Sequence, residues 1–142
     1  MTTDTVQRGR RSLAHTADQI VEAWGPTREA CLEEAALGLV ETFAEPHGVG
    51  WCDHAELVLS GSDEDLLVGL LEEIIYRLDT DRGVPVRVRV RPRGDAVRVD
   101  LWLTERGRLA ELGVAPKGVA YSQLYFAADA AGRWRCRVTI DV

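Results

Sequence analysis

The chain has 142 residues, of which 46% are hydrophobic and 28% are charged, and its formal net charge is -6. This length favours one domain with a core of its own, and the composition is that of an ordinary globular protein. The acidic balance argues against nucleic-acid or membrane binding driven by charge alone. No apolar run reaches the roughly 20 residues that a bilayer requires, and the N-terminus lacks a signal-peptide core, so a cytoplasmic protein without membrane contact is expected.

Residues 1–11 are polar and lack periodicity, which predicts a frayed N-terminal tail. Residues 20–24 have the β-branched and aromatic content of a short strand. Thr27 is a candidate N-cap for a helix whose apolar residues recur at helical spacing as far as Phe43. This helix is expected to end near Pro46, because proline cannot continue it.

The middle of the chain predicts a strand at residues 55–60 and a second helix after it. Ser62 is a candidate N-cap, and Asp65 three residues later comes close to a capping box. Leucine and isoleucine then recur at spacings of three, four and seven residues as far as Leu78. Both predicted helices carry one apolar face, so each is expected to cover a sheet or the other helix.

From Val84 onward the hydrophobic period changes to two. Residues 84–90 and 97–103 alternate on either side of a turn, which predicts a hairpin, and strands are also expected at 117–127 and 134–142. The order β-α-β-α followed by several strands predicts an α+β fold. We expect a single domain over residues 12–142, with two amphipathic helices packed on a mostly antiparallel β-sheet.

The amino-acid counts single out one cation and three thiols. Only one of the 17 basic residues, Lys117, is a lysine. A lysine ammonium is a compact point charge that can lose its proton when desolvated, whereas a guanidinium stays charged and prefers a forked partner. The cysteines are odd in number and form no CxxC pair, so a disulfide framework is not expected. They are Cys31, Cys52 and Cys136.

Carboxylates near the two chain ends are candidate ligands for a metal ion. Asp141 is the penultimate residue, so its carboxylate and the terminal carboxylate of Val142 would lie close together. Asp18 could add a third carboxylate from the other end of the chain, and hard cations such as Ca²⁺ or Mg²⁺ prefer such oxygen ligands. The alternative is that Asp141 is simply solvated and that Asp18 caps a turn. The residues alone leave both explanations open.

Other motifs give weaker signals. His15 and Asp18 form an HxxD pair, which is common and is explained equally well by a turn. Three arginines, at positions 87, 89 and 91, share one strand face and could contact RNA phosphates. The negative net charge of the chain favours the other explanation, that they form the solvated face of an antiparallel sheet. A zinc site is not indicated, because the spacing of the candidate ligands matches no usual structural site. These ligands are His47, Cys52 and His54.

The run HTAD at 15–18, with Trp24-Gly25 and an acidic helix after it, resembles the N-terminal signature of the archease family. The run KGVAY at 117–121 is similar to that family's Lys-Ala-Val/Ile-Thr-Tyr motif. Asp141-Val142 stands where archeases end in Asp-Ile, and the leucine-rich second helix matches in kind and position. The resemblance therefore covers about residues 12–142, with three separated motifs in the right order.

The resemblance implies an accessory protein that activates an RtcB-type RNA ligase and is not itself a catalyst. Such a ligase acts in tRNA splicing and RNA repair, and uses GTP and a divalent metal to attach GMP to its own histidine. Archeases promote this guanylylation and multiple turnover, so contact with GTP and RNA would be indirect, through the ligase. On this resemblance Asp18 and Asp141 would bind Ca, Mg or Mn, with the carboxylate of Val142. Lys117 would be an essential basic neighbour, and His15 is a further candidate.

Three residues depart from the family pattern. Gln19 replaces an isoleucine, Ala120 a threonine and Ser122 a histidine. If the family histidine helps to arrange the site, Ser122 weakens that function or marks a divergent branch of the family. Two other classes of function stay open. One is a stand-alone metal-dependent hydrolase of nucleotides or RNA, with the two aspartates as ligands and His15 as base. The other is a chaperone-like binding module whose polar cluster only joins the chain ends.

Overall fold

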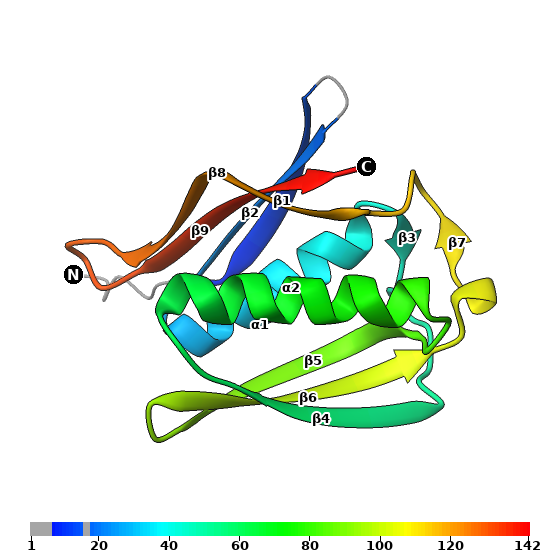
Figure 1. Ribbon diagram of the computed structural model, residues 1–142, viewed down its shortest axis with the longest axis horizontal. Coiled ribbons are helices and arrows are strands. Elements are labelled where there is room, and N and C mark those ends of the chain that lie inside the picture. Colours follow the sequence, from blue (N-terminus) through cyan, green and yellow to red (C-terminus); the bar gives the residue numbers. More distant parts are fainter. Residues whose placement is uncertain (1–6, 16–17) are drawn as a thin grey trace.

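The computed structural model describes residues 7–15 and 18–142, and places two helices between two antiparallel sheets (Figure 1). The four-stranded sheet contains, in spatial order, β1 (Gly9–His15), β2 (Asp18–Gly25), β9 (Trp134–Asp141) and β8 (Gly118–Ala128). The three-stranded sheet contains β4 (Asp53–Leu59), β6 (Ala96–Thr104) and β5 (Val84–Arg93). Between them lie α1 (Arg28–Glu41) and α2 (Asp63–Asp79). The predicted α+β architecture is confirmed.

Three short elements complete the chain. Strands β3 (Ala44–Glu45) and β7 (Ala110–Glu111) pair with each other, and a 3₁₀ turn, η1 (Arg106–Arg108), precedes β7. In the described ranges, the chain contains no helix long and apolar enough to span a bilayer.

Both helices begin where their capping residues predict. The Thr27 side chain accepts a hydrogen bond from the Ala30 N–H at 3.0 Å, and Ser62 and Asp65 complete a reciprocal capping box. The end of α1 differs from the prediction: the helix stops at Glu41, well before Pro46. The chain does not continue as a helix into residues 44–45, because their backbone pairs with β7 as strand β3. The local sequence does not reveal this pairing.

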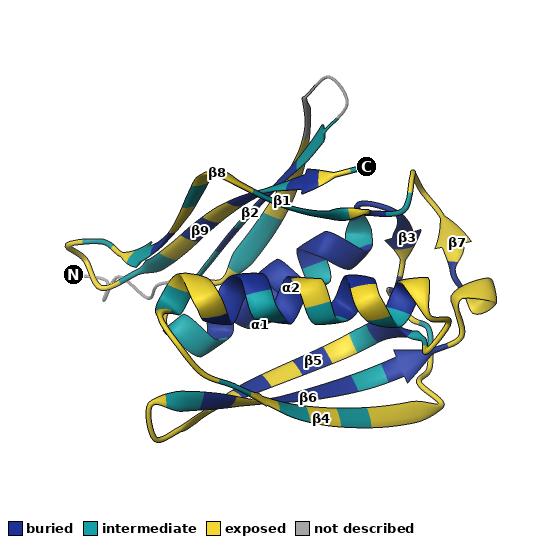
Figure 2. Cartoon of the chain, in the orientation of Figure 1, coloured by how far each residue is buried: buried dark blue, intermediate teal, exposed yellow. Residues whose placement is uncertain are grey.

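Helix α1 is buried on more than one face, which corrects the expectation of a single apolar stripe (Figure 2). It packs against β2 of one sheet and β5 of the other. Small residues make this possible, because they let the helix axis approach both sheets closely. They include Ala35, Ala36 and Gly38. Helix α2 keeps an exposed polar side, as predicted.

Ion pairs hold the first described residues against α1, so strand β1 starts at Gly9, inside the predicted 1–11 tail. Arg10 donates to Glu34 at 2.6 Å and to Glu41 at 2.8 Å, and Arg8 also pairs with Glu34. The hydrogen bonds that Arg10 donates to Glu41 raise the pKa of Arg10 above its usual value, although partial burial opposes this. These pairs span more than 20 residues of sequence, which explains why a polar segment without periodicity forms a strand.

All three cysteines are free, as expected. Cys31 and Cys136 are buried in the core, whereas Cys52 is exposed. A hydrogen bond with Cys136, together with burial, raises the pKa of the Cys31 thiol. The buried pair therefore behaves as small apolar packing groups.

Two helix glycines provide a matched test of the packing of α1. At Gly38 a new Cβ would lie 2.8 Å from Cγ1 of Val21, a fully buried residue that has no room to move, whereas at Gly69 the nearest atom is 3.4 Å away. Gly69→Ala should raise the free energy of unfolding by about 0.5–1 kcal/mol, because alanine is the better helix former. Gly38→Ala should lower it by about 1–3 kcal/mol through overpacking. Urea denaturation of both variants measures this, and equal stabilisation would contradict the packing described.

Candidate functional site

Strand pairing brings the two ends of the chain together. In the register of β2 and β9, Asp18 lies directly opposite Asp141. Residues paired in this way project from the same face of a sheet, with Cβ atoms about 4.5–5.5 Å apart. The neighbouring Ile140 is fully buried, so the side chain of Asp141 points away from the helices, and Asp141 is exposed. Asp18 is half-buried.

Lys117 immediately precedes β8 and lies at the same end of the sheet. Its backbone N–H donates to the carbonyl oxygen of Asp141 at 2.7 Å, and the next residue, Gly118, lies opposite Asp141 in the register of β8 and β9. We call Asp18, Lys117 and Asp141 the terminal cluster. Across the described ranges, no ion pair joins Lys117 to either aspartate. The backbone therefore brings the three predicted residues together, while their function stays a prediction.

A shallow groove of about 370 Å³ separates the start of β8 from α2, and Lys117 lines it. The helix contributes two carboxylates, Glu72 and Asp79, that the sequence analysis did not single out. The sequence feature that could have identified this pair is their spacing of seven residues, which places both carboxylates on the polar side of α2. Tyr121 donates its hydroxyl proton to Glu72 at 2.8 Å, and this hydrogen bond raises the pKa of Tyr121.

The strand that follows Lys117 is irregular. The pairing of β8 with β9 shifts register between Ala120 and Tyr125, and Gln123 has a φ of 62°, which non-glycine residues seldom adopt. Ser122, one of the departures from the archease pattern, lies inside this bulge and is exposed. Gln19, another departure, lies opposite Ile140, beside the two aspartates. Of these two departures, the backbone of Gln19 adjoins the terminal cluster, and Ser122 lies farther along β8.

Two other predicted site residues adjoin the terminal cluster in the chain trace. The backbone of His15 lies opposite Asp18 in the register of β1 and β2, but its side chain lies outside the described residues. Val142 follows Asp141 and is half-buried.

Two carboxylates directly opposite each other on neighbouring strands repel, which destabilises a sheet unless a cation or a basic group relieves the repulsion. Their oxygens are the donors that a hard divalent cation prefers. The donor chemistry therefore fits such a cation. The described residues contain no cluster of three His, Cys, Asp or Glu side chains suited to a metal.

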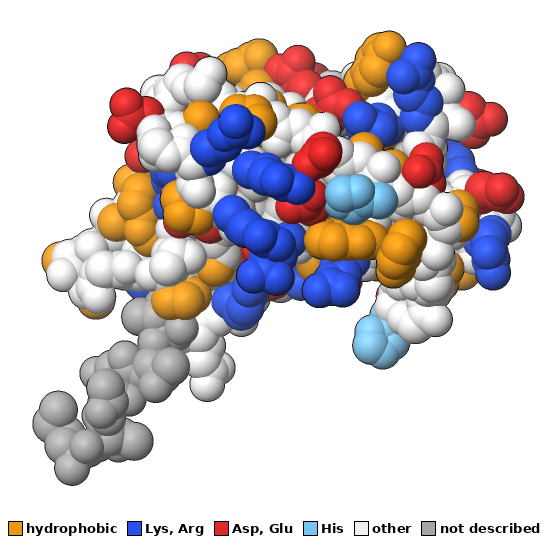
Figure 3. Space-filling model, turned by 90° about the horizontal axis from the view of Figure 1, so that it is seen from below, with side chains coloured by type: hydrophobic (Ala, Val, Ile, Leu, Met, Phe, Trp, Pro, Cys, Tyr) orange, Lys and Arg blue, Asp and Glu red, His pale blue; other side chains and the backbone are white. Residues whose placement is uncertain are grey.

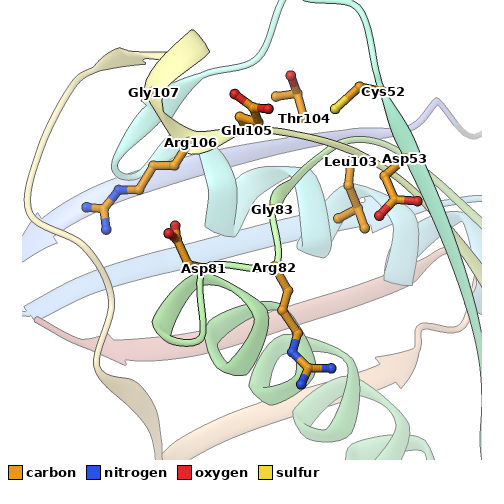
Figure 4. A pocket seen from close by; sticks show the side chains of 10 residues that line it. All are labelled: Cys52, Asp53, Asp81, Arg82, Gly83, Leu103, Thr104, Glu105, Arg106 and Gly107. Carbon is orange, nitrogen blue, oxygen red and sulfur yellow. The ribbon is translucent and has the colours of Figure 1, made fainter.

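A separate cavity of about 540 Å³ lies where the end of α2 meets the edge of the three-stranded sheet and η1 (Figure 4). Three acids, Asp53, Asp81 and Glu105, line it together with two arginines, Arg82 and Arg106. None of the predicted site residues lines it. The terminal cluster is thus associated with an exposed strand end and a shallow groove.

The fold and the site define a class: a small α+β protein in which acids from both chain ends meet on adjoining strands. The sequence profile of the archease protein family matches residues 11–142. A probable archease from Mycobacterium tuberculosis is 42% identical over 139 residues, covering 94% of this chain and 75% of the relative. The archease of Methanosarcina barkeri is 31% identical over 137 residues, covering 92% and 93%.

A solved structure agrees with the fold. The solution structure of Methanobacterium thermoautotrophicum protein 1598 matches with a TM-score of 0.70 and 20% identity, covering 94% of this chain and 99% of that one. With the profile match over nearly the whole length, the chain belongs to the archease family.

The repulsion between Asp18 and Asp141 predicts an unusual stability effect. In a chelating buffer, Asp18→Asn or Asp141→Asn should raise the free energy of unfolding by about 0.2–1 kcal/mol, because either change removes one of two opposing charges. Asp95→Asn is the matched control, since Asp95 is an exposed acid in the turn between β5 and β6. Denaturant titrations measure all three variants. Destabilisation by both site variants would show that the two carboxylates do not repel.

Proposed function

We propose that this protein is an archease-type accessory factor that activates an RtcB-type RNA ligase in tRNA splicing or RNA repair. In this role it promotes GTP- and metal-dependent guanylylation of the ligase and multiple turnover, and it is not itself the catalyst. Family membership supports the proposal. The observation that carries it is the meeting of Asp18, Asp141 and Lys117 at one end of the sheet.

The exposure of the site favours action on another protein. Lys117 and Asp141 are exposed, and the groove beside them is shallow and open. A surface of this kind can contact the rim of another active site, whereas it encloses no small substrate. GTP and RNA would then be reached only through the ligase, in the cytoplasm.

Each residue of the terminal cluster has a chemical role in the proposal. Asp18, Asp141 and the carboxylate of Val142 would hold Ca²⁺, Mg²⁺ or Mn²⁺, and such an ion would neutralise phosphate charge at the ligase. Lys117 would direct its compact ammonium to phosphate oxygens. Its backbone N–H donates to the carbonyl oxygen of Asp141, and its side chain lines the groove on the α2 side of the same strand end.

Substitutions in the terminal cluster should separate folding from activity. Asp18→Ala, Asp141→Ala and Lys117→Ala are each expected to leave the fold intact and to reduce stimulation of the ligase at least about tenfold, as for loss of one electrostatic contact. Lys117→Arg should also fail, because a guanidinium is larger and forked. The measurement is transfer of labelled GMP from GTP to a cognate ligase, with Asp95→Ala as control.

Two further observations distinguish the other functions. Nucleotide or RNA hydrolysis by this protein without ligase would favour a metal-dependent hydrolase. Full stimulation by the Asp18 and Lys117 variants would favour a chaperone-like module in which the terminal cluster only joins the chain ends.

A further inference from the structure

The outer face of the three-stranded sheet carries a row of arginines. Arg87, Arg89, Arg91 and Arg93 alternate along β5 with the core residues Val88 and Val90, and all four arginines are exposed. They therefore project from the face that turns away from the helices. Figure 3 looks at the molecule from this side and shows basic side chains gathered in a band, with hydrophobic and histidine side chains beside it.

Pairing across the sheet adds groups that the β5 sequence alone does not reveal. Arg91 lies opposite Arg98 of β6, and Arg87 lies opposite Trp102. On the next strand, His54 lies opposite Trp102. The arginine row thus continues onto β6 and ends beside two planar rings. We call the five arginines, Trp102 and His54 the arginine face.

Positive charge on the arginine face is only partly compensated. In the part of the chain that the structure describes, the four β5 arginines form no ion pair, and Arg98 pairs with Glu56 and Asp100. Asp100 also lies opposite Arg89 in the register of β5 and β6, although no ion pair joins these two described residues. The arginines on the other side of α1 contrast with this, because Arg8 and Arg10 are both held by glutamates. A local excess of positive charge therefore exists on a chain whose net charge is -6.

The rings at the end of the row are held in place. The guanidinium of Arg87 lies over Trp102, 4.7 Å from the ring centroid, and the His54 ring lies 5.0 Å from the same ring. His54 Nε2 is 3.0 Å from a carboxylate oxygen of Asp100. Asp100 is only 3% exposed, and its other oxygen has no hydrogen-bond partner. The first oxygen of Asp100 lies near both His54 and Arg98, so this buried carboxylate holds the two groups in place.

The spacing of the row selects a ligand. Alternate residues of a strand are roughly 6.6–6.8 Å apart, close to the separation of successive phosphates in an extended nucleic-acid strand. Guanidiniums recognise phosphate through forked hydrogen bonds. Carboxylates on an acidic protein surface follow no such regular line. We propose that the arginine face binds the backbone of single-stranded nucleic acid without sequence preference.

This surface is distinct from the terminal cluster. The arginine face lies on the three-stranded sheet, and the terminal cluster lies on the four-stranded sheet, with the helix layer between the two sheets (Figure 1). The proposal therefore stands or falls independently of ligase activation.

The test measures binding of fluorescent single strands of about 12 nucleotides, oligouridine RNA and oligothymidine DNA, by anisotropy. For wild type we expect dissociation constants of about 1–100 µM, with affinity falling as salt rises from about 50 to 200 mM. One phosphate contact from each of the four β5 arginines gives a slope of about -2.8 for the logarithm of the association constant against the logarithm of the salt concentration, at about 0.7 for each contact. Because both oligonucleotides present the same phosphate chemistry, similar affinities for RNA and DNA are expected.

Substitution of the row should remove this binding. The triple variant Arg89→Ala, Arg91→Ala, Arg93→Ala should bind at least about tenfold more weakly, with a slope near -0.7 from the remaining contact. The matched control is Arg135→Ala, Arg137→Ala, which removes two exposed arginines from β9 of the other sheet and should change affinity less than about twofold. A triple Lys variant keeps the charges, and should keep the salt slope while binding less tightly because the forks are lost.

Three results would overturn the proposal. One is that wild type binds neither strand. Another is that the β9 control weakens binding as much as the β5 triple variant. The third is that poly-glutamate displaces the oligonucleotide as effectively as an unlabelled single strand, because the arginine face would then be a docking surface for acidic proteins.

Discussion

The pairing of β2 with β9 is the interaction on which the rest of the structure depends. It joins residues from opposite ends of the chain in the centre of the four-stranded sheet, and it sets Asp18 directly against Asp141. The residues between those strands in sequence form both helices and the whole three-stranded sheet. A one-residue slip of this pairing would turn one aspartate toward the buried side, where Val138 and Ile140 now pack. The core therefore fixes the register that brings the carboxylates together.

The layered architecture gives the protein two outer faces with different chemistry. Because both helices lie between the sheets, each sheet buries one side and leaves the other to solvent. One outer face carries opposed carboxylates, and the other carries the row of arginines. An acidic chain can thus present a basic surface, since the net charge does not describe how charges are distributed. The proposed ligase contact and the proposed nucleic-acid contact would therefore use opposite faces of the domain.

The sequence predicted those features that depend on local pattern. The caps at Thr27 and Ser62, the stripe of α2 and the β5–β6 hairpin all follow from residues within a few positions of one another. Long-range effects were missed: β1 forms because of ion pairs with α1, and α1 ends early because β3 pairs with β7. The terminal cluster was found through a resemblance to a family and an unusual lysine. Glu72 was missed because only the folded groove places it near Lys117. The alternating arginines of β5 are evident in the sequence. The residues opposite them on β6 depend on the register of the two strands, which the sequence does not give.

The most direct test of the central claim, that acids from both chain ends form one cation site, is paramagnetic relaxation by Mn²⁺ in the NMR spectrum of the free protein. Substoichiometric Mn²⁺ should broaden the amide signals of Asp18, Gly118 and Asp141 together, and Asp141→Asn should remove all three effects. Broadening confined to the cavity that contains Asp53, Asp81 and Glu105, or broadening of Asp18 that survives Asp141→Asn, would contradict it.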